Sequence, residues 1–293
     1  MPRAGIVTVV GKPNAGKSTL LNRIVGEKLS IVSPKPQSTR NRIVGIRTTN
    51  DVQMVLFDTP GLLSPRYSLQ ESMRGAAIAA LNDADVVLHV VDGTDHVVED
   101  LATVAMLDRP LRAPTVLAFN KSDVMSPARL ESLAAERPTA AFISARDGSG
   151  VPELLLRLEQ MLPESPFLYP EDEVSTQTVR FFVSELVRET ALEQVEDELP
   201  YSIACEIEEF REAQSPVYIR AVLHVERDSQ KRILIGADGQ RIRAIGKSAR
   251  QKIEAFIGSP VYLDLWVKVL PNWRRDRKAL SRFGYPLPQD RSR

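Results

Sequence analysis

A short glycine-bearing segment near the N-terminus constrains this chain more than any other feature. It reads Gly11-Lys12-Pro13-Asn14-Ala15-Gly16-Lys17-Ser18 and fits the pattern G-x-x-x-x-G-K-S. The apolar run Ile6–Val10 precedes it and the helix-like Thr19–Val25 follows it, so it joins a strand to a helix. In that setting, successive backbone N–H groups and the positive end of the helix bind phosphate oxygens. The segment therefore predicts a phosphate-binding loop within an α/β domain.

Several residues are expected to act on the phosphates and on a divalent cation. Lys17 can reach the β- and γ-phosphates, and the Ser18 hydroxyl can bind Mg²⁺. Asp58-Thr59-Pro60-Gly61 follows the apolar run Val52–Phe57, which places Asp58 for a second Mg²⁺ contact and the Gly61 N–H near the γ-phosphate. Thr39 lies between these motifs and is expected to bind Mg²⁺ when a γ-phosphate is present, although spacing alone also allows a plain surface loop.

A second group of residues predicts the base that is recognised. Asn120-Lys121-Ser122-Asp123 ends the apolar run Thr115–Phe119. The Asp123 carboxylate can accept hydrogen bonds from guanine N1–H and N2–H, a donor pair that adenine lacks, so GTP is favoured over ATP. Asn120 is expected to brace the loops and the Lys121 stem to cover the base. Ser144-Ala145 is expected to place a backbone N–H near guanine O6.

The residue that follows Asp58–Gly61 bears on which group orients water for GTP hydrolysis. Ras-type proteins place there a glutamine that orients water, whereas this chain has Leu62, which cannot do so. We therefore expect slow turnover in which Lys17, Thr39 and Mg²⁺ act on the phosphates. The Asn14 side-chain oxygen is expected to help hold K⁺ beside them.

The order of apolar runs predicts two domains. Strands at Ile6–Val10, Val52–Phe57, Val86–Val91, Thr115–Phe119 and Ala141–Ile143 alternate with helical segments, the pattern of a mainly parallel sheet with helices on both faces. A helix is predicted over Val151–Leu162, and the prolines that follow mark a boundary. We predict a nucleotide-binding domain over residues 1–165, a linker over 166–178, a second domain over 179–270 and a basic tail over 271–293.

The second domain is predicted to be α+β. A helix is expected over Val179–Val195, strands over Tyr201–Phe210, Val217–Val225 and Val261–Val269, and two helices around the sequence Gly236-Ala237-Asp238-Gly239. A Gly-x-x-Gly loop between helices lets a nucleic-acid backbone approach, as in KH domains. The predicted RNA contacts are Arg232, Ile235, Gly236, Ala237, Asp238, Gly239, Arg241, Ile242 and Lys247. On the following helix, Ile242, Ile245, Ala249, Ile253 and Phe256 are expected to face the sheet.

Charge segregation supports a nucleic-acid partner despite a formal net charge of +0. Residues 227–252 carry eight basic and two acidic side chains, and residues 271–293 carry seven basic and two acidic ones. The basic tail fits a solvated terminus as well as an RNA contact. Trp266 and Trp273 show no paired base-stacking arrangement and are expected in the core, as is His89. The single cysteine and the lack of a long apolar run predict a cytosolic protein.

These motifs together resemble the Era family of bacterial GTPases, within the TrmE/Era/EngA class. The resemblance rests on Gly11–Ser18, Lys35-Pro36-Gln37-Ser38-Thr39-Arg40, Asp58–Gly61, Asn120–Asp123, Ser144-Ala145, Glu198-Leu199-Pro200-Tyr201 and Arg232–Gly246. It implies a P-loop GTPase domain followed by a type II KH domain. It also implies binding of the 3′ end of 16S ribosomal RNA, a role in 30S subunit assembly, and association of some members with the inner membrane. Arg146 departs from the Leu or Lys usual in the family.

Two alternatives remain open at this stage. The chain could bind GTP without turnover and act as an RNA-binding assembly factor. It could also be a membrane-associated regulator that uses the basic tail on anionic lipid. We expect a monomer that exchanges GTP and GDP.

Overall fold

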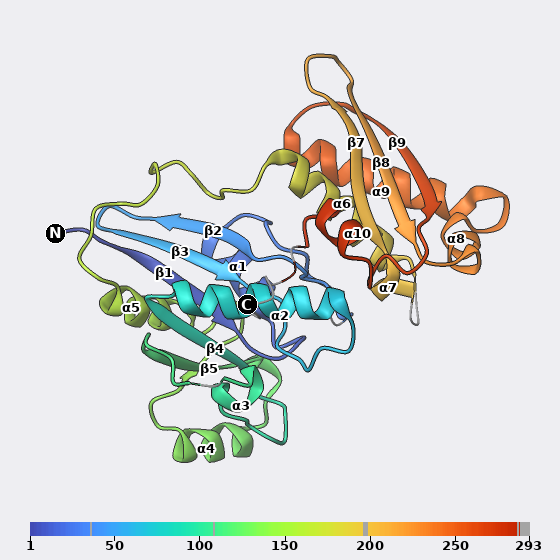
Figure 1. The fold of residues 1–293 in the computed structure, drawn as a ribbon. Coiled ribbons are helices and arrows are strands. Elements are labelled where there is room, and N and C mark those ends of the chain that lie inside the picture. Colours follow the sequence, from blue (N-terminus) through green and yellow to red (C-terminus); the bar gives the residue numbers. More distant parts are fainter. Residues whose placement is uncertain (36, 108, 196–198, 286, 288–293) are drawn as a thin grey trace, which may run out of the picture. The chain divides into compact units, whose positions relative to one another are not determined.

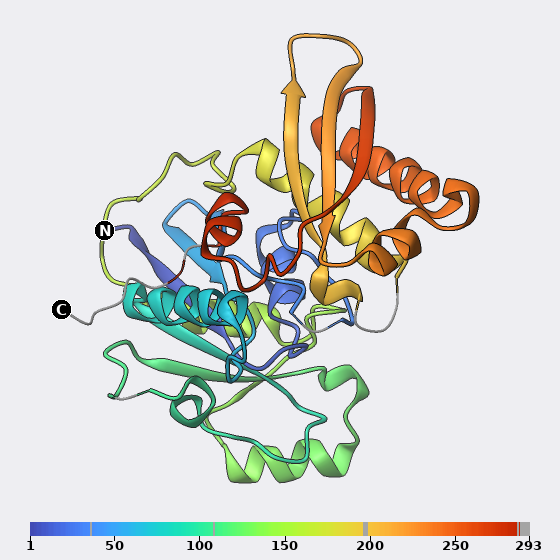
Figure 2. The same cartoon turned by 45° about the vertical axis from the view of Figure 1, so that its right-hand side comes forward.

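The computed structural model describes residues 1–35, 37–107, 109–195, 199–285 and Leu287. Pro36, Glu198 and the end of the predicted tail lie outside these residues. The chain divides into two compact units. The first comprises residues 1–66 and 70–176, and the second comprises residues 67–69 and the chain from Gln177 onward. Figures 1 and 2 show the elements of both units.

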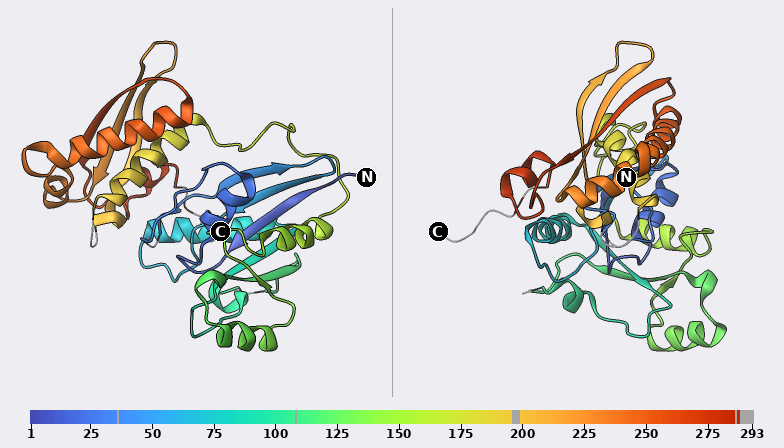
Figure 3. Two further views of the ribbon diagram at one scale, coloured as in Figure 1. Left: turned by 180° about the vertical axis from the view of Figure 1, so that it is seen from behind. Right: turned by 90° about the vertical axis from the view of Figure 1, so that its right-hand side faces the viewer.

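The first unit is built on a six-stranded sheet with the order β2-β3-β1-β4-β5-β6. All neighbouring strands are parallel except β2 and β3. Helix α2 lies in front of the sheet in Figure 1, and α1 and α5 lie behind it (Figure 3, left). The strands are β1 Arg3–Val10, β2 Ile43–Thr48, β3 Val52–Asp58, β4 Val86–Asp92, β5 Thr115–Asn120 and β6 Ala141–Phe142. The helices are α1 Lys17–Val25, α2 Ser68–Asp83, α3 Leu101–Ala105, α4 Pro127–Glu136 and α5 Val151–Met161, with a 3-10 turn, η1, at Ser122–Val124.

This architecture confirms the predicted mainly parallel α/β sheet, and all five predicted strands are present. Strand β2 was missed. It is the antiparallel edge strand and contains Gly45, a residue that is depleted in strands. A Cβ at Gly45 would lie 2.7 Å from Val25 Cγ2, so the glycine lets α1 pack closely on the sheet.

The predicted linker is partly a packed segment of the first unit. The Gln53 side chain on β3 is buried and binds the backbone of this segment. Its Oε1 accepts from the N–H groups of Leu168 at 2.7 Å and Tyr169 at 2.9 Å, and its Nε2 donates to Tyr169 O at 2.9 Å. Farther along, Ile46 N donates to Val174 O at 2.9 Å. These bonds fix residues 168–174 along the β2–β3 edge, and the boundary between the units falls after Thr176.

The second unit is an α+β domain with a three-stranded sheet in the order β7-β8-β9. Strand β8 pairs antiparallel with β7 and parallel with β9. One face of this sheet packs on α6, α8 and α9, where Ile219, Leu234 and Ile245 are fully buried. The elements are α6 Val179–Glu193, α7 Leu199–Ser202, β7 Ala204–Arg211, β8 Val217–Val225, α8 Asp228–Ile235, η2 Ala237–Gly239, α9 Gln240–Ile257, β9 Val261–Val269 and α10 Arg277–Arg282. This order confirms the predicted type II KH architecture.

Three local predictions in this unit are wrong. Trp266 does not lie in the core, because its side chain on β9 is 54% exposed. The strand predicted from Tyr201 begins at Ala204, because Leu199–Ser202 forms a helical turn in which Ser202 Oγ donates to Leu199 O at 2.8 Å. Phe256 does not join the sheet core. It lies at the end of α9, where its ring packs against Phe182 of α6 with centroids 5.5 Å apart and leaves the side chain 38% exposed.

The basic-tail prediction is wrong for residues 273–285. Trp273, Leu280 and Tyr285 are buried, and Trp273 Nε1 donates to Ser202 O at 2.9 Å. The Phe283 ring packs edge-on against Trp273 and lies over His224. Arg282 makes two bonds to the Glu206 carboxylate, at 2.8 and 2.6 Å. The segment therefore completes the KH unit by covering one end of its sheet.

We predict that Trp273→Ala destabilises the KH unit strongly. Truncating a fully buried tryptophan leaves a cavity and costs about 3–5 kcal/mol, to which the lost bond to Ser202 adds. Urea unfolding of the full chain measures the loss. Trp266→Ala is the matched control, since Trp266 is 54% exposed and its truncation should change stability little. Equal losses from both variants would contradict the burial assignment.

Candidate functional site

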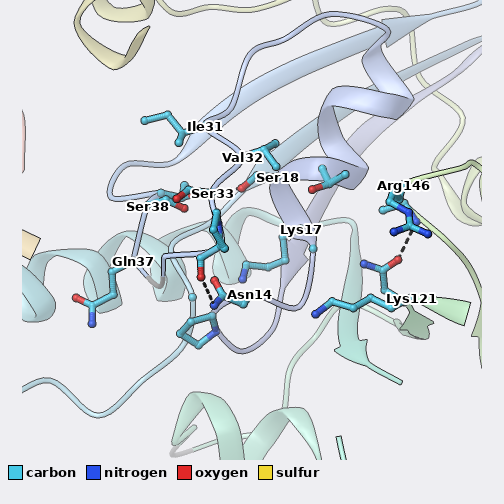
Figure 4. Close-up of a pocket in the computed structure, with 18 of the residues that line it drawn as sticks. Asn14, Lys17, Ser18, Ile31, Val32, Ser33, Gln37, Ser38, Lys121 and Arg146 are labelled. Atoms are coloured by element: carbon cyan, nitrogen blue, oxygen red, sulfur yellow. Dashed lines mark hydrogen bonds between the residues drawn. The ribbon is translucent and has the colours of Figure 1, made fainter. Parts of the chain in front are cut away.

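The phosphate-loop residues curl between the carboxyl ends of β1 and its neighbours. Gly16 has φ +93°, and a Cβ there would lie 2.0 Å from Asn120 Nδ2. A Cβ at Gly11 would lie 2.1 Å from Val90 O on β4. Both glycines are therefore required by close backbone packing, and Asn14 also adopts positive φ, at 63°. The loop opens onto a pocket of about 440 Å³ (Figure 4).

Lys17 lies at the base of this pocket. Its side chain is buried, and its Nζ donates to Gly11 O at 3.2 Å and to Lys12 O at 2.9 Å. Burial lowers the Lys17 pKa to about 8, and the nearby Asp58 carboxylate works in the opposite direction. The loop thus carries a desolvated amine held by its own carbonyl oxygens, in position to meet an anionic ligand.

The predicted metal ligands come together beside Lys17. Ser18 Oγ donates to Asp58 Oδ2 at 2.6 Å and lies 2.9 Å from Thr39 Oγ1. Asp58 is fully buried, and its Oδ1 has no hydrogen-bond partner among the described residues. Burial raises the Asp58 pKa, while the Lys17 charge lowers it. Two hydroxyls and a buried carboxylate with an unsatisfied oxygen fit Mg²⁺, a hard cation that prefers oxygen ligands and takes the rest from phosphate and water.

The predicted base-site residues surround the other end of the pocket. Asn120 braces two loops, because its Nδ2 donates to Ala15 O at 2.8 Å and its Oδ1 accepts from Ala145 N at 2.8 Å. Lys121 pairs with Asp92 at the end of β4. Asp123 lines the pocket, and its carboxylate pairs with Arg146 Nη2 at 2.6 Å.

The structure also places the remaining predicted residues. Leu62 is buried and its N–H donates to Gly11 O at 3.1 Å, so its side chain does not take part in water positioning. Asn14 donates from Nδ2 to Pro34 O at 2.9 Å, which ties the phosphate loop to residues 31–35. Thr59 Oγ1 donates to Val9 O at 2.8 Å and has a structural role. Pro13, Thr19 and Gly61 line the pocket, whereas Pro60 and Ser144 are buried beside it and Lys12 pairs with Glu99 outside it.

Sequence reasoning missed Arg23. This residue in the last turn of α1 donates from Nε to Ala145 O at 2.6 Å and from Nη2 to Arg146 O. Arg23 thereby holds the Ser144-Ala145 loop against the base site. No spacing rule links Arg23 to a loop more than a hundred residues later, so the sequence carried no signal for it.

The Gly-x-x-Gly loop forms as predicted between α8 and α9. Gly236 and Gly239 have φ +73°, and a Cβ at Gly236 would lie 2.8 Å from Arg241 Cβ. Asp238 also has positive φ, at 49°. Ala237 is exposed and Ile235 and Ile242 pack partly against the core. The basic side chains around the loop are exposed, namely Arg232, Arg241, Arg243, Lys247 and Arg250.

Comparison with known proteins identifies the same two domains, a GTPase domain and a KH domain. A family model described as a 50S ribosome-binding GTPase matches residues 6–121, and a KH-domain model matches residues 198–274. GTPase Era of Carboxydothermus hydrogenoformans is 40% identical over 97% of this chain and 98% of its own length. GTPase Era of Pseudomonas aeruginosa strain PAO1 is 43% identical over 97% of this chain and 95% of its own length.

The chain belongs to the Era family of GTPases.

Solved Era structures cover almost the whole fold. Era in complex with MgGDPNP and nucleotides 1506–1542 of 16S ribosomal RNA has a TM-score of 0.92 at 38% identity, covering 98% of this chain and all of that one. A tyrosine-to-alanine variant of Aquifex aeolicus Era bound to GDP and AlF4⁻ has a TM-score of 0.91 at 38% identity, covering 97% of this chain and all of that one. Nucleotide hydrolysis is thus the activity of the family, which answers the open alternative of an RNA adaptor without turnover.

Two further features are absent from the part of the chain that the structure describes. No helix there is long and apolar enough to cross a membrane. No group of three His, Cys, Asp or Glu side chains could hold a metal ion there. His89 is buried in β4 as predicted, and burial lowers its pKa to about 4, so it stays neutral near pH 7.

We predict that Arg23→Ala weakens GDP binding to this Era-family chain about tenfold, since two hydrogen bonds from a charged group to the base loop are lost. Titration calorimetry with Mg²⁺ and GDP measures the change. Arg157→Ala is the matched control, because Arg157 also donates to a backbone carbonyl of the same unit, Thr139 O, away from the pocket. Unchanged GDP affinity in Arg23→Ala would contradict the positioning role.

Proposed function

We propose that this Era-family GTPase binds the 3′ end of small-subunit ribosomal RNA through its KH unit and assists assembly of the 30S subunit in a GTP-dependent manner. The observation that carries the proposal is the presence in one chain of the Lys17–Ser18–Asp58 cluster and the exposed basic Gly236–Gly239 loop. A relative with the same fold over 98% of this chain was solved with MgGDPNP and nucleotides 1506–1542 of 16S ribosomal RNA. Such a role suits the cytosol.

In this proposal, the nucleotide is held from both ends. The N–H groups of the phosphate loop and Lys17 bind the phosphates, and Asp123 accepts from the guanine base. Ser18, Asp58 and Thr39 would hold Mg²⁺, which neutralises charge on the phosphates when it is bound. Asn14 in the phosphate loop binds Pro34, and Ser18 contacts Thr39. The segments around Pro34 and Thr39 are therefore held by residues that lie close to the γ-phosphate.

The KH unit supplies the RNA contacts in this proposal. Gly236 and Gly239 adopt positive φ and carry no Cβ, and no residue of the turn Ala237–Gly239 is buried, so a phosphodiester backbone can approach the loop closely. Arg241 and Lys247 are exposed on the first half of α9 and supply positive charge. Arg241 Nη1 donates to Ile233 O at 2.7 Å, which fixes this side chain beside the loop. A monomeric state and peripheral membrane association stay predictions.

We predict that Lys17→Ala lowers GTP hydrolysis by roughly 100-fold or more, because the ammonium group that stabilises charge on the transferred phosphoryl group is lost. Phosphate release under single-turnover conditions measures the rate. Arg157→Ala serves again as the control and should hydrolyse GTP at the normal rate. Binding of the 16S RNA fragment by Lys17→Ala without nucleotide should match that of the unsubstituted chain. Normal phosphate release from Lys17→Ala would contradict the proposed catalytic role.

We also propose that K⁺ stimulates hydrolysis through the Asn14 side-chain oxygen. Asn14 uses its amide nitrogen for Pro34, so the oxygen points away from that contact. Leu62 stands where Ras-type proteins have the glutamine that orients water, so another group has to assist hydrolysis. We expect a rate about tenfold higher in KCl than in NaCl, a change of ~1.4 kcal/mol in the barrier. Asn14→Ala should remove the difference between the salts. Equal rates of the unsubstituted chain in both salts would contradict the proposal.

A further inference from the structure

The face of the KH sheet that is turned away from the helices carries exposed aromatic rings. On β8 and β9, alternate residues such as Ile219 and Val267 point into the helix-packed core. Their neighbours point the other way, and the parallel register sets Tyr218 beside Tyr262 and Val222 beside Trp266. Tyr262 is 59% exposed and Trp266 is 54% exposed. We call the group of Tyr218, Tyr262, Trp266, Arg211 and Arg220 the aromatic face.

The rings of the aromatic face are held in fixed orientations. Tyr218 and Tyr262 stack with centroids 5.8 Å apart and planes at 13°. One carboxylate, that of Asp264, accepts from Tyr218 Oη at 3.0 Å and from Trp266 Nε1 at 2.7 Å. The polar edges of Tyr218 and Trp266 are therefore satisfied within the sheet, while the Tyr262 and Trp266 side chains stay more than half exposed. Such a platform loses little side-chain entropy when another flat group stacks on it.

Arginine side chains border the rings. Arg211 and Arg220 place their guanidinium carbons 5.0 and 5.8 Å from the centroid of the Tyr218 ring. Arg220 also donates to Asp264 at 2.9 Å, and Arg211 pairs with Glu209 at 2.5 Å. Because carboxylates balance both charges, the face is suited to stacking more than to phosphate binding. Single-stranded RNA is recognised by bases that stack on aromatic rings and on arginine planes.

The position of the face points to the same RNA that the Gly236–Gly239 loop binds. Strand β9 is the edge strand of the sheet, and it packs on both α8 and α9, which flank that loop. Tyr262 and Trp266 are on β9, on the face opposite to those helices. Strand β9 begins beside the last turn of α9, where Val261 N donates to Glu254 Oε1 at 3.0 Å, so Trp266 is the nearer of the two rings to the loop. A KH loop clamps about four nucleotides. The RNA solved with the relative spans nucleotides 1506–1542, which extends well beyond that length.

We propose that the aromatic face is a second RNA-contact surface, on which unpaired bases of the same ribosomal RNA stack after the strand passes the Gly236–Gly239 loop. The inference rests on the proposed function of the KH unit. It concerns only bases in single-stranded regions, since paired bases do not offer their ring faces to a protein platform.

The test compares two RNAs and three variants of the full chain. The long RNA corresponds to nucleotides 1506–1542, and the short RNA is the tightest-binding fragment of about eight nucleotides taken from it. Trp266→Ala and Tyr262→Ala should each weaken binding of the long RNA about tenfold and leave the short RNA unaffected. Trp266→Phe, which retains a ring, should restore most of the affinity. GTP hydrolysis without RNA should be normal in all three variants.

Salt dependence separates stacking from phosphate contacts. Trp266→Ala should leave the slope of log K against log[salt] unchanged, whereas Lys247→Ala should reduce the slope by about one and weaken both RNAs. The chain has two tryptophans and Trp273 is fully buried, so iodide quenching reports on Trp266. The long RNA should protect this emission from iodide, and the short RNA should not.

Two results would overturn the inference. Base stacking would be excluded if Trp266→Ala and Tyr262→Ala bind the long RNA with normal affinity, and if the long RNA does not change iodide quenching of Trp266 in the unsubstituted chain. If those variants bind the long RNA normally but lose affinity for intact 30S subunits, the face binds a ribosomal protein instead. Failure of the proposed function would look different, because the unsubstituted chain would then bind neither RNA.

Discussion

The contact between the phosphate loop and the ends of β4 and β5 is the constraint on which the nucleotide site depends. Gly11 lies so close to Val90 O, and Gly16 so close to Asn120 Nδ2, that no side chain fits at either position. This packing fixes the curl of the loop and thereby the directions of its N–H groups. It also fixes Asn120, whose other side-chain atom holds Ala145 N at 2.8 Å. One asparagine thus couples the phosphate end of the pocket to the base end.

The two units use their sheets in different ways. In the first unit, helices cover both faces and the chemistry gathers at the carboxyl ends of the strands, where the loops after β1, β3 and β5 meet. In the second unit, α6, α8 and α9 cover one face, and the segment that contains α10 reaches only one end of the other face. Trp273 and Phe283 cover one end of the other face, and the rest stays open with Tyr262 and Trp266 exposed. The KH sheet therefore has a surface available for contacts in addition to its Gly-x-x-Gly loop.

Much of the nucleotide site could be predicted because its signals are local. A phosphate loop between a strand and a helix, Asp58 at the end of β3 and Asn120 at the end of β5 each follow a short run in the sequence. Strand order then brings the runs together. Arg23, Arg146 and the packed segment 168–174 were missed or left without a role, because their partners lie far along the chain and no spacing rule connects them.

The aromatic residues show the same limit in the KH unit. From the sequence, both Trp266 and Trp273 were expected in the core, yet Trp273 is fully buried and Trp266 is 54% exposed. Alternation along β9 sends Trp266 to the open face, and the register with β8 decides which ring it neighbours. Trp273 is buried because residues 273–285 return to the sheet, which a composition rich in Arg, Pro and Gly did not indicate. Long-range pairing decides both outcomes.

We propose that Asp123 recognises a guanine base at one end of the pocket, while the phosphate loop binds the phosphates at the other end. Competition binding of GDP and xanthosine diphosphate to the unsubstituted chain and to Asp123→Asn, with Mg²⁺ present, tests this claim most directly. We expect the unsubstituted chain to prefer GDP and the variant to prefer xanthosine diphosphate, because the amide donates where the carboxylate accepts. A variant that keeps the original preference for GDP would contradict the assignment of the base site.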